Sequence, residues 1–294
     1  MNKHTVEILL VIATAFMSVS AILIRFTEAP SMVLVFYRML FTSLIMLPLI
    51  LWKYVGEMKR IPKSDVMMCI ASGVILALHF ASFFESLRYT SITSNLVLVN
   101  TSAFFVAFIS MIVFKERMPF KGWLAILITF AGSAVISLSD LSLGGDSALY
   151  GDLLAILGAL FFAFYAVIGR KERKEISVIP YTFIIYTVAA ITSLIILLIT
   201  GERITGYGQN DYLAALGMAV FCTLMGHSIY NWGFKYVTAS FVSVVALSEP
   251  VFGSILGMLF FNEVPTVLII IGSVITLVGM YIFSLVENEN KNDG

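Results

Sequence analysis

The chain has 294 residues, of which 60% are hydrophobic and only 12% are charged, and its formal net charge is zero. Soluble domains carry about 25% charged residues, so this composition excludes an ordinary globular protein and indicates a polytopic membrane protein. A neutral chain without a basic excess also gives no reason to expect a nucleic-acid partner.

Ten apolar segments of about membrane-spanning length follow one another along the chain. The first lacks a small-x-small cleavage site, so we expect a retained helix and not a signal peptide. The sequence therefore predicts an all-α membrane protein with ten transmembrane helices. The segments are Val6–Ile24, Met32–Leu51, Val66–Leu87, Ile92–Phe114, Trp123–Leu138, Leu149–Gly169, Ile179–Thr200, Tyr212–Phe234, Ala239–Phe261 and Val264–Val286.

The basic residues of the connecting loops divide unequally when alternate loops are assigned to the same side. By the positive-inside rule this division predicts that both termini are cytoplasmic, in a protein of the plasma or inner membrane. The short polar tail, residues 287–294, would then be cytoplasmic and disordered. One side holds Lys3, Lys53, Lys59, Arg60, Lys63, Lys115, Arg117, Lys121, Arg170, Lys171, Arg173, Lys174, Lys235 and Lys291, and the other holds Arg25, Arg88 and Arg203.

Segment one carries a row of polar residues, Glu7, Thr14, Ser18 and Arg25, whose spacings of 7, 4 and 7 place them on one helical face. This face is typical of one wall of a polar cavity. The alternative is that the charged residues reach the interfaces while the hydroxyls bond to their own helix. In segment two, the lone Arg38 would reach the outer headgroups or pair with an acid on another helix.

Segments three and eight each carry a histidine within a polar face. His79 shares its face with two serines, and His227 shares its face with Tyr230 and Asn231. The two histidines would lie on either side of a central cavity, at different depths. The alternative for each is a bundle histidine whose hydrogen bonds are satisfied by its neighbours.

Segment nine carries Glu249 about 15 Å from its start, near the bilayer midplane, followed by Pro250. A carboxylate at this depth usually faces a bundle interior or a wet cavity, and the proline predicts a kink with a free carbonyl. Asn100 and Ser102 lie at the equivalent depth in segment four, and Tyr165 reaches it in segment six. We expect these residues to line the transport pathway, although hydrogen bonding between helices or packing would also retain them.

The two halves of the chain resemble each other when the first is shifted by 147 residues, half the length. Because each half holds five helices, the second must enter the membrane from the opposite side, so the repeats would be inverted. We expect a first repeat over residues 1–147 and a second over 148–286. The matches include Tyr89 with Tyr236, Phe105 with Phe252, Phe114 with Phe261, Glu116 with Glu263, Thr129 with Thr276 and Gly132 with Gly279.

Four stretches carry a family likeness: VLVFYRMLFTSLIML, VNTSAFFVAFISMIVFKERM, FFAFYAVIGRK and LSEPVFGSILGMLFFNE. With them, nearly the whole chain resembles the EamA-type members of the drug/metabolite transporter superfamily. The resemblance implies ten helices in an inverted repeat, with a central cavity that carries small organic solutes such as amino acids or other metabolites, often outward. One departure is that the chain has Thr101-Ser102-Ala103 where members often have proline, which argues against a kink matching Pro250.

We therefore predict a transporter of a small-molecule substrate, monomeric or homodimeric in the bilayer, with its cavity lined by segments one, three, four, six, eight and nine. We expect no catalytic residues, no cofactor and no metal, and Cys69 and Cys222 fall inside apolar segments. Glu249 would either carry a proton or pair with a cationic group of the solute. The alternatives are a channel, or an intramembrane enzyme that uses Glu249 and the two histidines as acid and base.

Overall fold

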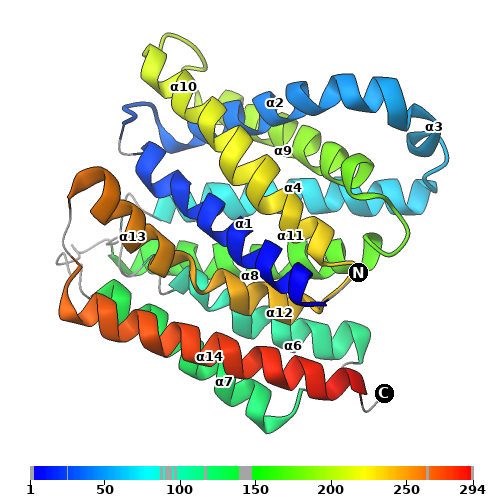
Figure 1. Cartoon of the computed structure of the whole chain (residues 1–294). Helices are drawn as coiled ribbons and strands as arrows, with labels where there is room; N and C mark the ends of the chain where they lie inside the picture. The colour runs from blue at the N-terminus through cyan, green and yellow to red at the C-terminus, as the bar shows by residue number, and fades with distance from the viewer. Residues whose placement is uncertain are drawn as a thin grey trace.

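The computed structural model describes residues 3–24, 26–86, 89, 95, 98–115, 118–138, 148–262 and 265–292. Arg25, Arg88, Glu116, Arg117, Ser147 and Glu263 lie outside the described residues. Within the described part the regular structure is entirely helical (Figure 1). Its helices are α1 Lys3–Ile24, α2 Ser31–Leu49, η1 Ile50–Tyr54, α3 Val55–Met58, α4 Lys63–Ser86, α6 Ser102–Phe114, α7 Phe120–Leu138, α8 Ala148–Glu172, α9 Val178–Thr200, α10 Gln209–Gly217, η2 Met218–His227, α11 Ser228–Gly233, α12 Ala239–Ala246, α13 Glu249–Phe261 and α14 Val267–Asn292.

The chain is a multi-pass membrane protein. In the described part, eight helical stretches are long and apolar enough to cross a membrane, and shorter apolar helices cover 98–114 and 120–136. Each predicted segment overlaps one of these helices. The prediction of a disordered tail is wrong for its first part, because α14 continues as a helix to Asn292.

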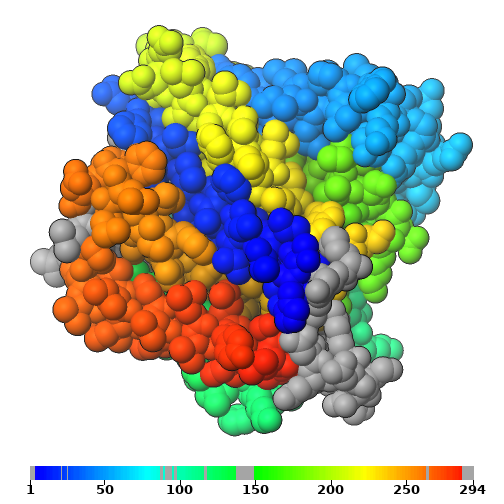
Figure 2. All heavy atoms as spheres, in the orientation of Figure 1, coloured from blue at the N-terminus to red at the C-terminus, as the bar shows by residue number. Residues whose placement is uncertain are grey.

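The first helix of each half packs against two elements of the other half. Helix α1 contacts η2 on one side and α13 on the other, and Figure 2 shows α1 lying in the groove between these segments. Its counterpart α8, the first helix of the second half, contacts α4 and α6. The two halves therefore pack against each other in a reciprocal way: α1 packs against two elements of the second half, and α8 packs against two elements of the first.

Helices α7 and α14 form a close antiparallel pair (Figure 1). A Cβ atom at Gly132 would collide with the backbone of Thr276, and a Cβ atom at Gly279 would collide with the backbone of Thr129. Glycine is thus required at both positions by the close approach of the helices. Since Thr276 and Gly279 lie 147 residues after Thr129 and Gly132, the two contacts are exchanged copies of each other, as they are around a two-fold axis.

Helices α6 and α13 begin and end at equivalent residues. Their first residues, Ser102 and Glu249, are 147 positions apart. Each helix ends just before a residue in the left-handed region, Lys115 with φ 55° and Asn262 with φ 54°. The predicted kink at Pro250 is instead an interruption between α12 and α13, with the proline in the first turn of the new helix, where it is well tolerated.

The expectation that segment four lacks a matching break is wrong. The helix that ends near Thr101 is interrupted before α6 without any proline. The Thr101 hydroxyl donates to the Leu98 carbonyl at 2.5 Å, and the hydroxyl of Ser248, the residue equivalent to Thr101, donates to the Val245 carbonyl at 2.7 Å. The two breaks thus carry the same local hydroxyl-to-carbonyl bond at equivalent positions.

Candidate functional site

A cavity of about 100 Å³ lies where the two interrupted segments meet the other helices. Glu249 and Ser102, the first residues of α13 and α6, both line it. The cavity therefore combines polar groups at the helix breaks with a largely aromatic wall. Its lining residues are Met17, Ser20, Arg38, His79, Phe80, Phe83, Phe84, Val99, Asn100, Ser102, Phe162, His227, Ala246 and Glu249.

Arg38 lines the cavity, whereas the sequence analysis expected it either to reach the outer headgroups or to pair with an acid on another helix. Its side chain is 4% exposed, and its Nε donates to the Thr223 hydroxyl at 2.7 Å. The guanidinium carbon lies 4.7 Å from the centroid of the Phe80 ring, in a cation–π contact. Arg38 is buried and so does not reach the outer headgroups, and among the described residues it makes no ion pair, although Glu249 lies near enough to attract it electrostatically. Segment two thus joins the predicted cavity-lining segments.

The two predicted histidines line the same cavity and have different hydrogen-bond states. The carbonyl of Gly158 can only accept, so the contact of 2.9 Å from His79 Nδ1 places a hydrogen on that nitrogen. Nδ1 of His227 is buried and has no hydrogen-bond partner within the described part of the chain. The Phe80 ring lies against both imidazoles, with centroid distances of 5.1 Å to His79 and 5.6 Å to His227.

The position of the histidines bears on the enzyme alternative. They share one cavity, but His79, His227 and Glu249 form no hydrogen bonds with one another. An acid–base pair acting on one substrate needs groups within hydrogen-bond reach of the same atoms. The Phe80 ring contacts both imidazoles, and the described structure shows no hydrogen bond that would pair the two histidines for proton transfer.

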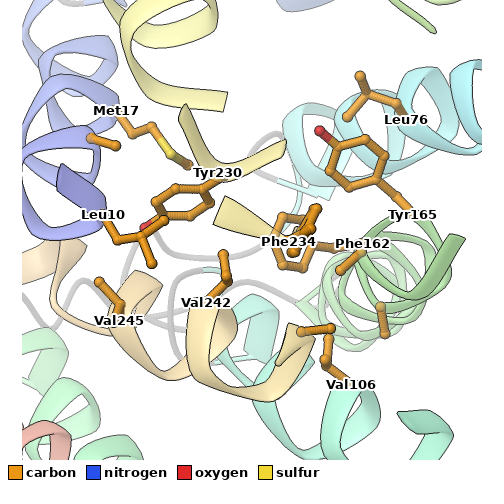
Figure 3. Close-up of a cluster of buried hydrophobic side chains, with 14 of the residues drawn as sticks. Leu10, Met17, Leu76, Val106, Phe162, Tyr165, Tyr230, Phe234, Val242 and Val245 are labelled. Atoms are coloured by element: carbon orange, nitrogen blue, oxygen red, sulfur yellow. The ribbon is translucent and has the colours of Figure 1, made fainter. Parts of the chain in front are cut away.

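Five of the predicted pathway residues lie behind the cavity wall and support it. The hydroxyl of Tyr230 lies 2.5 Å from that of Thr14, and Ser18 donates to the carbonyl of Glu249 at 3.0 Å, so α1 is tied to both α11 and the helix break. Figure 3 shows Tyr230 beside Leu10 and Met17 of α1. The hydroxyls of Thr14 and Ser18 also donate to carbonyls of their own helix, which the sequence analysis gave as the alternative to a cavity wall.

Tyr165 and Asn231 form the second part of this supporting layer. The amide nitrogen of Asn231 donates to the Tyr165 hydroxyl at 2.5 Å and to the carbonyl of His227 at 2.8 Å. Both side chains are fully buried, and neither is among the described residues that line the cavity. They fix the end of η2, where His227 faces the cavity. Asn100 does line the cavity, and its amide donates to the Ser133 hydroxyl at 2.6 Å.

Several lining residues escaped the sequence analysis because they are apolar. The phenylalanines Phe80, Phe83, Phe84 and Phe162 and the Met17 side chain make up much of the wall, and such residues are common throughout an apolar chain. Thr223 does not line the cavity, but it accepts a hydrogen bond from Arg38 Nε and was missed as well. It lies in η2, and a π-helix often marks a functional position. In the described part of the chain, no group of three His, Cys, Asp or Glu residues could hold a metal ion.

Comparison with known proteins places this cavity in a family context. The sequence profile of the EamA-like transporter family matches residues 4–138 and again residues 149–285. An "Uncharacterized transporter" of Archaeoglobus fulgidus is 25% identical over 258 residues, 87% of this chain and 88% of that protein. The "Pseudopaline exporter CntI" of Pseudomonas aeruginosa is 25% identical over 273 residues, 92% of this chain and 93% of that protein.

A solved crystal structure shares the fold. It covers 97% of this chain and 99% of its own, with a TM-score of 0.82 at 16% sequence identity. At that identity the likeness concerns the arrangement of the helices alone.

Proposed function

The chain belongs to the EamA-like transporter family, and from this premise we propose that it is a secondary transporter that moves a small organic metabolite through the central cavity by alternating access. The observation that carries the proposal is the position of the cavity at two interrupted helices, one in each half. Substrate sites of transporters with inverted repeats are typically formed by such broken helices, near the middle of the membrane.

The inverted arrangement of the ten helices is supported by the packing of α7 against α14. Equivalent residues make exchanged contacts there, and the two helices run antiparallel. A two-fold axis that relates antiparallel spanning helices is perpendicular to them, and so lies in the membrane plane. Such an axis allows the two halves to exchange roles, one opening outward as the other opens inward.

Export is the direction we propose, because a relative that covers most of the chain is named as an exporter. We further propose that Glu249 couples transport to protons. It is a carboxyl group in the cavity at a helix break, and it has no ion-pair partner among the described residues. A carboxyl group so placed can take up a proton from either side as the cavity changes its exposure.

Counterflow in proteoliposomes tests the transport function directly. Vesicles containing the purified protein are loaded with unlabelled amino acids, nucleosides or amines, and uptake of the same labelled compound from outside is followed. We expect preloading to accelerate uptake of at least one compound, with saturation at high external concentration. A channel would give flux that does not saturate and is not accelerated by preloading, and empty vesicles provide the baseline.

Thiol labelling tests the orientation of both termini in the cytoplasm. Ser64, in the first turn of α4, and Gly208, just before α10, are exposed at helix ends predicted on opposite sides. Cys69 and Cys222 are buried at 0% and 1% exposure and should stay silent. In intact cells we expect an impermeant maleimide to label Gly208→Cys and not Ser64→Cys. Labelling of Ser64→Cys alone would show that the predicted orientation is reversed.

A further inference from the structure

We propose that Arg38 binds a carboxylate of the transported solute, so that the carried compounds are small organic acids. This inference rests on the proposed function and adds the chemical class of the substrate. It begins with the donors of the guanidinium group, which carries five N–H bonds. Only Nε is used by the protein, in the bond to the Thr223 hydroxyl, and the terminal nitrogens have no hydrogen-bond partner among the described residues.

The free edge of the guanidinium faces the cavity. Arg38 lines the cavity while one side of its plane is covered by the Phe80 ring. Its terminal nitrogens are absent from the buried side-chain atoms that lack partners in the described structure, which is consistent with their access to the cavity. A pair of parallel N–H groups in this position matches the two oxygens of a carboxylate.

A charged group at this depth needs a counter-charge. Arg38 lies seven residues into α2, about 10 Å along the helix, and arginine keeps its proton in proteins. The other titratable groups of the cavity wall are His79, His227 and Glu249. The histidines supply no negative charge, and Glu249 attracts Arg38 across the cavity without making an ion pair with it. The outer edge of the guanidinium therefore remains open to the carboxylate of a molecule that enters the cavity.

The protein also holds Arg38 in a fixed orientation. The Thr223 hydroxyl donates to the carbonyl of Met218 at 3.3 Å, which directs its oxygen lone pairs away from that carbonyl and leaves them for Arg38 Nε. This bond spans five residues, in keeping with the π-helical course of η2. With Nε held at one end and Phe80 against its face, the guanidinium presents its outer edge without having to be ordered by the ligand.

The remainder of the cavity suits the body of a small acid. Phe83, Phe84, Phe162 and Met17 provide apolar surface around the guanidinium edge, within a cavity of about 100 Å³. Ligand sites commonly combine such an apolar lining with a few polar groups that fix orientation. We therefore expect a compact aliphatic or aromatic group beside the carboxylate, and weak binding of neutral analogues with the same body.

Matched acids and amides test the proposal. The probes are 3-phenylpropionate with 3-phenylpropionamide, isovalerate with isovaleramide, and phenylalanine with phenylalaninamide. Binding to the purified full-length protein is measured by isothermal titration. We expect at least one acid to bind about 10- to 100-fold more tightly than its amide, the range for hydrogen bonds to charged groups. Arg38→Gln should abolish this difference, and Arg38→Lys should recover only part of it because it lacks the two-pronged edge.

Thr223 provides a positioning control that leaves the charge in place. Thr223→Val removes the acceptor for Nε, and we expect it to reduce the preference for acid over amide several-fold, whereas Thr223→Ser should restore the preference. A role of Thr223 in folding alone would lower the affinity for acid and amide equally. This variant also keeps the proposal testable should Arg38→Gln fail to fold.

Five outcomes would overturn the proposal. Equal binding of acid and amide by the wild type, or an acid preference that survives Arg38→Gln, would show that Arg38 is not the anchor. Recovery of the preference in the Arg38→Gln, Glu249→Gln double variant would show that Arg38 only offsets the charge of Glu249. Counterflow of amines or amides without any binding of acids would agree with the proposed transport function and would exclude a carboxylate as the group that Arg38 binds. No binding and no counterflow of any probe would count against both proposals.

Discussion

Glu249→Gln is expected to abolish accumulation driven by a pH difference while it preserves exchange of solute across the membrane. Glutamine keeps the size of the side chain and its hydrogen-bonding capacity, but it cannot take up and release a proton at neutral pH. In the wild type, a difference of one pH unit stores about 1.4 kcal/mol per proton, enough for up to about tenfold accumulation. Without the carboxyl group nothing carries the proton, so the pH difference should no longer raise the internal solute concentration above the external one.

Two assays on the same proteoliposomes separate the roles of Glu249. Counterflow at equal pH reports exchange, and uptake after a pH step reports coupling. Glu28→Gln is a matched control, because Glu28 is exposed and lies outside the cavity. Loss of counterflow in Glu249→Gln would instead mean that an ionised Glu249 binds a cationic group of the solute. A variant that keeps both activities would show that Glu249 has only a structural role.

The sequence predicted where along the helices the cavity lies better than it predicted which residues line the cavity. Glu249 was identified because a carboxylate deep in an apolar segment is costly, and the register of 147 residues then pointed to Ser102. Both residues line the cavity, at the first position of equivalent helices. Depth along a helix and internal repetition can be read from a sequence, so these inferences needed no knowledge of how the helices pack.

Which face of a helix reaches the cavity was harder to predict. Tyr165, Tyr230 and Asn231 were expected to line it, but buried hydrogen bonds hold them one layer behind. A polar group satisfied by another helix and one satisfied by a ligand give the same sequence signal, since neither can remain unpaired in an apolar interior. Arg38 illustrates the converse, because its partners Thr223 and Phe80 lie far from it in the chain and only the fold brings them together.

The break at Thr101 shows how a local rule can mislead. The absence of proline in segment four suggested an unbroken helix, because proline is the strongest breaker of helical hydrogen bonding. In the structure, the Thr101 and Ser248 hydroxyls bond to the carbonyls three residues earlier, and both helices are interrupted. The equivalence of these two residues was visible in the register of the repeat, although the local bond was not.

Ser102→Trp is expected to reduce transport by about 100-fold or more in a protein that still folds. Ser102 is 8% exposed and lines the cavity at the start of α6, at the position equivalent to Glu249 in the other half. The cavity of about 100 Å³ has no room for both an indole ring and a solute. Because the ring would enter existing space, the cost in stability should stay within the range of about 1 to 3 kcal/mol seen for overpacked interiors.

The matched control for Ser102→Trp lies on the same helix. Phe108 is 59% exposed on the outer surface of α6, so Phe108→Trp adds an indole ring without filling the cavity and should transport like the wild type. Ser102→Ala should also remain active, since it removes a hydroxyl and adds no bulk. Counterflow rates are compared after size-exclusion chromatography and thermal unfolding confirm that each variant is folded. A folded Ser102→Trp protein with the wild-type rate would show that solute passes elsewhere, because a route through this cavity cannot tolerate the indole ring.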